Sequence, residues 1–118
     1  MSIPSGSGTE VLKRGTFTVT DTTDTKILDG VANHIYTVLS IVFCETAGNA
    51  ETFGLFLDPS AGGTDYALLT KQQVALPANG TFIFNDRLVL VGTDELNVKM
   101  GGTCDIDIVI SYIDQDWT

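Results

Sequence analysis

Apolar residues recur at every second position along much of this chain, and no segment repeats them at the 3.6-residue spacing of an amphipathic helix. Residues 16–20 alternate hydroxyl and apolar side chains, and residues 105–113 place Ile106, Ile108, Ile110 and Tyr112 on one side. Alternation of this kind predicts half-buried β-strands. Residues 35–44 are apolar on both sides of a strand, which predicts a central strand covered by protein on both faces.

Clusters of Gly, Asn, Asp and Pro separate these segments at short intervals. Between the clusters we expect further short strands, at residues 25–28, 52–57, 66–69, 74–76, 81–84, 87–91 and 96–100. Many short strands with turns between them are typical of an antiparallel β-sandwich. The sequence therefore predicts an all-β fold, an antiparallel β-sandwich of about eight strands with jelly-roll or immunoglobulin-like topology, and leaves the strand order open.

The two ends of the chain differ in character from its middle. A length of 118 residues fits one domain, and we expect residues 15–118 to form the sandwich and residues 1–14 an N-terminal arm that begins rich in serine and glycine. Trp117 is the only tryptophan, and tryptophan is frequent among the residues that dominate protein–protein binding. Both ends are therefore predicted to contact other proteins, through Ile3, Pro4, Val11, Leu12, Asp116 and Trp117.

The charge of the chain argues against two classes of partner. The formal net charge is -9, and the six basic residues are scattered, whereas nucleic-acid binding draws much of its affinity from clustered Lys and Arg. An acidic surface is repelled by anionic lipid, and no stretch approaches the roughly 20 apolar residues of a membrane span. The first residues lack the basic and apolar regions of a signal peptide. We expect a protein made in a cytoplasm, with neither nucleic-acid nor membrane partners.

Two cysteines, Cys44 and Cys104, and one histidine, His34, leave few routes to a metal site. No CxxC motif occurs, so a structural zinc site within one chain is not expected. Without a secretion signal, two free and buried thiols are the favoured interpretation of the cysteines. A disulfide would require their two strands to be neighbours, which the sequence leaves open.

Catalytic residues are equally scarce, and we expect no enzyme and no cofactor. Any Ser-His or Cys-His pair must use His34, whose place at a strand edge is typical of a solvated or capping residue. Calcium binding in the loop at residues 58–65 is a minor alternative, because its spacing matches no EF-hand. Most of the paired carboxylates lie in predicted turns, where Asp bonds its own backbone: Asp21 and Asp24, Asp58 and Asp65, Asp94 and Glu95, Asp105 and Asp107, Asp114 and Asp116.

A carbohydrate- or cell-surface-binding module is the alternative from another functional class. Such sandwiches usually bind through exposed aromatic side chains. Most aromatic residues here occupy strand positions consistent with the core, and only Tyr66, Tyr112 and Trp117 are left as candidates for exposure.

Between Ile35 and Asp114 the order of several segments is distinctive. An aromatic-led strand at residues 35–41 is followed by a turn and strand at residues 46–57 and by the turn Leu76-Pro77-Ala78-Asn79-Gly80-Thr81. The strand Leu88-Val89-Leu90, the turn Gly92-Thr93-Asp94-Glu95-Leu96 and the closing Ser111-Tyr112-Ile113-Asp114 complete it. In this order the chain resembles a family of short structural proteins of tailed bacteriophages. One position departs from this pattern: after Cys44 we expect Asn or a similar polar residue that begins a turn, and the chain has Glu45 there.

The resemblance implies a virion component with no catalytic residues. The favoured role is a capsid decoration, or cement, protein that stabilises the head by bridging neighbouring capsid subunits; a tail, neck or fibre component is the alternative. The implied partners are the major capsid protein or other virion proteins, and further copies of the chain in a homo-oligomer, with a trimer favoured. The implied location is the virion, assembled in the cytoplasm of the host bacterium.

Overall fold

The computed structural model describes residues 9–59 and 64–117, which form β-strands joined by turns and loops. No helix able to cross a membrane occurs in that part of the chain. The strands are β1 (Thr9–Val19), β2 (Thr25–Asp29), β3 (His34–Glu45), β4 (Glu51–Asp58), β5 (Tyr66–Leu76), β6 (Thr81–Phe84), β7 (Leu88–Val91), β8 (Glu95–Met100) and β9 (Ile106–Asp116).

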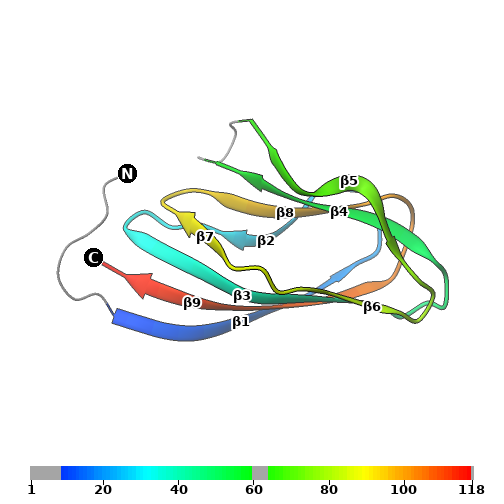
Figure 1. Cartoon of the computed structure of the whole chain (residues 1–118), viewed down its shortest axis with the longest axis horizontal. Helices are drawn as coiled ribbons and strands as arrows, with labels where there is room; N and C mark the ends of the chain where they lie inside the picture. The colour runs from blue at the N-terminus through cyan, green and yellow to red at the C-terminus, as the bar shows by residue number, and fades with distance from the viewer. Residues whose placement is uncertain (1–8, 60–63, 118) are drawn as a thin grey trace.

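The strands form two antiparallel sheets that lie over one another as layers (Figure 1). Sheet A has the order β1-β9-β3-β6, and sheet B has the order β2-β8-β4-β5. Strand β7 also belongs to sheet A, because β6 pairs with residues 41–44 of β3 and β7 pairs with residues 35–38. Strands β6 and β7 therefore act as one interrupted edge strand, and each layer is four strand positions wide.

The pairing pattern identifies the topology as a jelly roll. Strand β1 pairs with β9, β2 with β8, β3 with β6 and β7, and β4 with β5. The chain is thus a long antiparallel hairpin that has been rolled up, so that β9 also meets β3 and β8 also meets β4. This arrangement gives the two Greek keys of a double-sheet jelly roll. The predicted antiparallel sandwich is confirmed, and the strand order selects the jelly-roll form.

The core lies between the two sheets and follows the alternation of the sequence. Ile106, Ile108 and Ile110 of β9 are fully buried, and the aromatic rings of Phe43 and Phe53 meet across the layers with centroids 4.6 Å apart. Burying each large apolar side chain contributes about 1.5–3 kcal/mol relative to leaving it in water. The inward row of each strand therefore holds the two sheets together.

Glu45, at the end of β3, has a structural reason for departing from the expected turn residue. Its side chain is buried, and its carboxylate accepts hydrogen bonds from the backbone N–H groups of Ala47, Gly48, Asn49 and Asn79 at 2.8–3.0 Å. Gly48 and Asn79 both have positive φ, which orients these N–H groups inward. The N–H of Asn79, followed by those of the β3–β4 turn, holds the pKa of Glu45 below its usual value. One carboxylate thus ties together two turns at one end of the sandwich.

The structure also corrects three predicted boundaries. Strand β1 begins at Thr9 and pairs without interruption with β9, so residues 9–14 of the predicted arm belong to the sheet; residues 1–8 lie outside the described residues. The two strands expected at residues 66–69 and 74–76 are one strand, β5. Strand β9 runs on to Asp116, three residues beyond the expected end at Ile113. The early start of β1 and the late end of β9 have the same cause, because these two strands pair with each other there and supply each other's hydrogen bonds.

Candidate subunit interface

The side of sheet A that faces away from the core carries two rows rich in apolar and β-branched side chains, separated by the polar row of Arg14, Ser111 and Ser40. The pairing register places Leu12, Ile113, Thr37 and Val89 in one row across the sheet, and Thr16, Val109, Val42 and Ile83 in a second row. These residues alternate with the buried residues of the same strands, so their side chains point outward. We call this surface the outer apolar face; it comprises the outward positions of β1, β9, β3, β6 and β7.

Several side chains of the outer apolar face are strongly exposed. Leu12 is 74% exposed, Ile83 58% and Val89 51%. Charged residues occupy only three outward positions of the face: Glu10, Arg14 and Asp107. Exposed apolar groups that are bordered by polar residues often mark sites of contact with other molecules. The sheet therefore presents an uncovered surface suited to protein contact.

This finding corrects the expectation that β3 is covered on both sides. Its inward residues, such as Phe43 and Ile41, are fully buried against sheet B. Its outward residues, including Ile35 and Val42, are only half-buried, because the described part of the chain supplies no layer over them. The sequence of β3 is that of a strand enclosed on two faces, whereas this chain encloses one.

A shallow hollow interrupts the outer apolar face near its middle. Strand β3 carries a bulge at Leu39, where its register with β9 shifts between Val38 and Ser40. The hollow has a volume of about 370 Å³, and it is lined by Leu12, Lys13, Arg14, Leu39, Ser111 and Tyr112. Bulges often redirect a side chain at a functional surface. Here the bulge places an apolar recess beside the most exposed leucine of the face.

Sheet B shows what a solvated face of the same protein looks like. Lys26 of β2 forms ion pairs with Glu95 of β8 at 2.9 Å and with Asp29 at 3.7 Å. Lys99 of β8 lies 3.8 Å from Asp24. Exposed ion pairs of this kind add little stability, but they keep a surface hydrated. The two faces thus differ in chemistry, and the difference makes the outer side of sheet A the candidate contact surface.

The residues predicted to contact other proteins fall in different places. Leu12 lies on the outer apolar face, whereas its neighbour Val11, 46% exposed, points to the other side of β1. The side chains of Asp116 and Trp117 are half-buried, and the N–H of Trp117 donates to the carbonyl of Asn33 at 2.9 Å. The indole N–H of Trp117 is enclosed and has no acceptor among the described residues. Ile3 and Pro4 lie outside the described residues.

Most of the face was not among the predicted site residues. Alternation separates the two sides of a strand but does not tell which side faces the core. This applies to the outward residues Ile83, Val89, Val109 and Ile113. The available signal was that β3 is apolar on both of its sides, although a single sheet-on-sheet core covers only one side of a strand.

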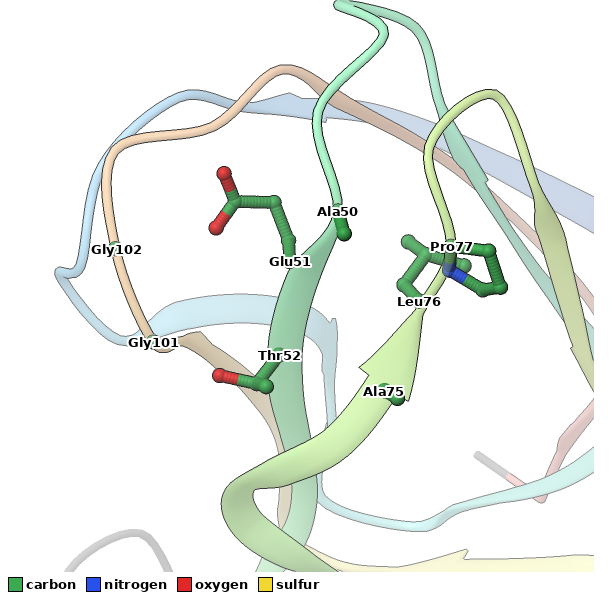
Figure 2. A pocket seen from close by; sticks show the side chains of 8 residues that line it. All are labelled: Ala50, Glu51, Thr52, Ala75, Leu76, Pro77, Gly101 and Gly102. Atoms are coloured by element: carbon green, nitrogen blue, oxygen red, sulfur yellow. The ribbon is translucent and has the colours of Figure 1, made fainter.

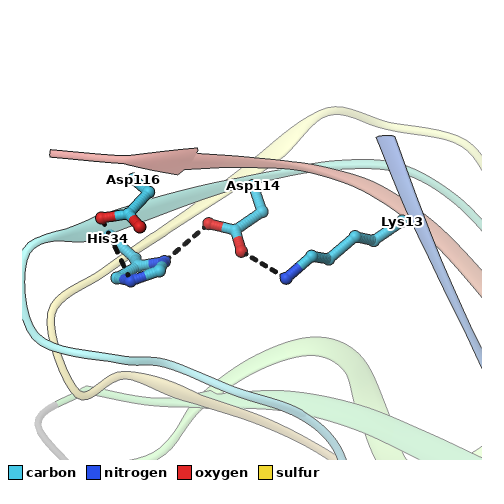
Figure 3. A network of polar contacts seen from close by, with 4 residues as sticks. All are labelled: Lys13, His34, Asp114 and Asp116. Carbon is cyan, nitrogen blue, oxygen red and sulfur yellow. Dashed lines mark hydrogen bonds and ion pairs between the residues drawn. The ribbon is translucent and has the colours of Figure 1, made fainter. Parts of the chain in front are cut away.

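A polar network lies on the inward side of the same sheet, at the end where β1 begins and β9 ends (Figure 3). Asp114 of β9 is 3% exposed; it accepts from the ammonium of Lys13 at 2.7 Å and contacts Nδ1 of His34 at 2.7 Å. Asp116 lies 3.5 Å from Nε2 of the same ring. Burial would raise the pKa of Asp114, but the bonds from Lys13 and His34 lower it on balance. The network joins the first half of β1 to β9 and β3.

The network corrects the expectation that His34 is solvated or capping, and it gives the residue a structural role. A general base needs a ring nitrogen directed at a nucleophile. Both nitrogens of His34 face carboxylates instead, those of Asp114 and Asp116. Within residues 9–59 and 64–117, no three His, Cys, Asp or Glu side chains are grouped so as to hold a metal ion. The calcium alternative involved residues 60–63, which are not among those described.

We predict that Asp114→Asn destabilises the fold by about 1–3 kcal/mol at pH 7, because it leaves Lys13 and His34 without the buried carboxylate. The pKa of Asp114 is lower in the folded state than in the unfolded chain, so its contribution is complete above about pH 4 and is lost as the pH falls further. Thermal unfolding from pH 2 to pH 7 measures this. The difference between wild type and variant should shrink in acid, and a constant difference would contradict the assignment. Asp107→Asn, an exposed position on the same strand, is the control.

An open pocket of about 330 Å³ lies at the opposite end of the sandwich, among the start of β4, the end of β5 and the turn after β8 (Figure 2). Its one charged lining residue is Glu51, whose carboxylate points toward the segment of Gly101 and Gly102. Ala50, Thr52, Ala75, Leu76 and Pro77 complete the lining. Glu51 is thus the one titratable side chain of the lining, and no second acid or base stands beside it there.

The two cysteines are free and lie on different sides of sheet A. Cys44 is half-buried at an outward position of β3, opposite Asp107 and Thr81. Cys104 is buried, and its thiol contacts the carbonyl of Val19 at 3.3 Å. Burial, followed by nearby carboxylates, raises the pKa of Cys104 to about 11. The expectation of free thiols is confirmed, but the expected burial holds for Cys104 alone: Cys44 is half-buried and has the exposure needed for reaction.

Comparisons with known proteins identify the fold. No protein-family model and no curated protein matches the sequence. A chain from the structure of Bacillus endospore appendages, described as a novel family of disulfide-linked pili, superposes with a TM-score of 0.53 at 14% identity, over 100% of this chain and 98% of that one. A chain from the capsid structure of Helicobacter pylori bacteriophage KHP30 superposes with a TM-score of 0.52 at 8% identity, over 91% of each chain. At these identities the shared property is the fold, over nearly the whole length.

Proposed function

We propose that this chain is a structural protein of a bacteriophage virion, and specifically a capsid decoration protein that bridges neighbouring capsid subunits. The observation that carries the proposal is the outer apolar face, on which Leu12, Ile83 and Val89 are each more than half exposed although the chain carries a net charge of -9. A surface of this composition loses contact with water when it binds protein, which is the main favourable term in association. The resemblance to phage structural proteins and the fold shared with a phage capsid chain support the same role.

The physical logic of the role follows from the two faces of the sandwich. A rigid jelly roll holds the outer apolar face in a fixed shape, so little conformational entropy is lost when it binds. The carboxylates elsewhere, and the ion pairs of sheet B, keep the rest of the surface hydrated and the chain soluble. The outer apolar face is thereby left as a side on which contacts with other subunits of the assembly can form.

A tail, neck or fibre component of the virion is the second candidate. The fold shared along its full length with a chain from pili supports it, because a filament, like a fibre, repeats one subunit. The number of copies per particle separates the two roles. Quantitative mass spectrometry of purified particles should give hundreds of copies for a decoration protein, and between six and a few dozen for a tail or neck component (order-of-magnitude estimates from closed symmetry).

Removal of residues 2–9 is expected to weaken association with particles by about tenfold or more. This segment contains Ile3 and Pro4, and an extended segment can add main-chain hydrogen bonds to a neighbouring sheet edge. Co-sedimentation with particles assembled without the protein measures binding, and circular dichroism of the isolated variant should retain the β spectrum. Equal recruitment of the truncated and full-length chains would show that the segment takes no part. Replacing residues 2–9 by a Gly-Ser segment of equal length separates its sequence from its length.

A further inference from the structure

We propose that the outer apolar face binds the same face of a second copy of this chain, with Leu12 of each copy entering the hollow beside Leu39 of the other. The proposal names the partner of the surface that carries the proposed function, and it rests on that function only in treating this surface as a contact. Contact of a patch with its own counterpart generates a closed two-fold dimer.

The first argument is shape. Leu12 projects from the face and is 74% exposed, while the hollow of about 370 Å³ lies next to it and is lined by Leu12, Arg14, Leu39 and Ser111 among others. One chain thus carries a protruding apolar side chain and an apolar recess side by side. A two-fold axis that passes between Leu12 and the hollow brings the Leu12 side chain of each copy to the hollow of the other copy. Anchors buried in such central pockets supply most of the affinity of an interface.

The second argument is area. Sheet A is four strand positions wide, and β1 and β9 each have 11 residues. With strands about 4.8 Å apart and a rise of about 3.3 Å per residue, the face measures roughly 600–700 Å² in projection. Stable interfaces bury about 800 Å² of accessible surface on each partner, and accessible surface exceeds projected area. The face is therefore large enough for a stable dimer.

The third argument is charge and surface form. The charged outward positions of the face are Glu10, Arg14 and Asp107, so each copy offers one cation and two carboxylates. Two identical faces can pair these charges across the interface, whereas a strongly basic or acidic partner would find little complement. Rows of β-branched side chains such as Val42, Val109 and Ile83 also suit packing against another sheet about 10 Å away.

Sedimentation equilibrium of the purified full-length chain tests the proposal, with protein concentration varied from about 1 μM to 1 mM to bracket typical dimer affinities. The wild type should pass from monomer to dimer. Because a two-fold dimer contains the Leu12 contact twice, Leu12→Glu should weaken dimerisation by about 100-fold or more. Val31→Glu is the matched control: Val31 is an exposed valine between β2 and β3, outside the face, and this change should alter the dissociation constant by less than about twofold.

A chain that is monomeric throughout the concentration range, or a dimer indifferent to Leu12→Glu, would overturn the proposal. Thermal unfolding of each variant excludes loss of the fold as the cause. Co-sedimentation with particles keeps the two proposals separate. Suppose that the wild-type chain is monomeric and binds particles, and that the Leu12→Glu variant no longer binds them. The face then contacts a different protein, and the second-copy proposal fails alone. If the dimer forms as described and particles never bind, the proposed virion function fails alone.

Discussion

A chain that carries both Ile83→Lys and Val89→Lys is expected to fold normally and to bind its assembly at least 100-fold more weakly. Both side chains are more than half exposed in the free chain, so placing an ammonium there changes the stability by about 0.5 kcal/mol or less for each substitution. If the outer apolar face binds protein as proposed, the same positions are enclosed in the assembly, where an unpaired buried charge costs several kcal/mol. The substitutions thus separate binding from folding.

The matched control adds the same two charges elsewhere. Val31 and Tyr66 are 47% and 59% exposed, and neither belongs to sheet A. The pair Val31→Lys and Tyr66→Lys should leave assembly within about threefold of wild type, because exposed rim charges act mainly on association rates. Co-sedimentation with particles and thermal unfolding measure both properties for each chain. If the control pair weakens binding as much as the pair on sheet A, net charge rather than the outer apolar face governs association.

The second large effect is expected from Glu45→Gln, which should lower the melting temperature by about 10 °C. The carboxylate of Glu45 accepts from four backbone N–H groups, three of them at Oε1 and one at Oε2. The amide of Gln has one accepting oxygen and directs its N–H₂ at donors on the other side, so some of the four backbone N–H groups lose their acceptor. Amide hydrogen exchange should accelerate at Ala47, Gly48, Asn49 and Asn79 before it accelerates in the core strands.

The pH dependence of the Glu45→Gln effect has a definite sign. The bonded N–H groups, that of Asn79 first, hold the pKa of Glu45 below its value in the unfolded chain. Its contribution is therefore complete above about pH 4.3 and is lost as the pH falls below that value. Glu51→Gln, a half-buried carboxylate at the same end of the molecule, serves as the control and should change the melting temperature by about 2 °C or less. Equal effects of the two substitutions would contradict the clamp assigned to Glu45.

Alternation predicted the strands well, because an inward apolar row is needed wherever two sheets pack. It failed at the first half of β1, where residues 10–14 show no alternation and the strand exists because β9 supplies its hydrogen bonds. It also left the strand order open, since register depends on side chains from distant parts of the chain. The jelly-roll order follows only from those pairings.

The candidate site was harder to predict than the fold. Of the expected contact residues in the described chain, Leu12 alone lies on the outer apolar face. Its neighbour Val11 points to the opposite side of β1, because successive side chains of a strand alternate between its two sides. The role of His34 depended on Asp114, which is 80 positions away in sequence. The informative feature was β3, which is apolar on both sides. One of these sides packs in the core, and the other lies on the outer apolar face.

The most direct measurement of the central claim is the rate at which Cys44 reacts with a thiol reagent in the free and the assembled chain. Cys44 lies on the outer apolar face, while burial and a pKa of about 11 keep Cys104 unreactive in the folded protein. If protein covers this face in the assembly, labelling of Cys44 should slow by about tenfold or more. Equal labelling rates in free and fully assembled chains would contradict the claim.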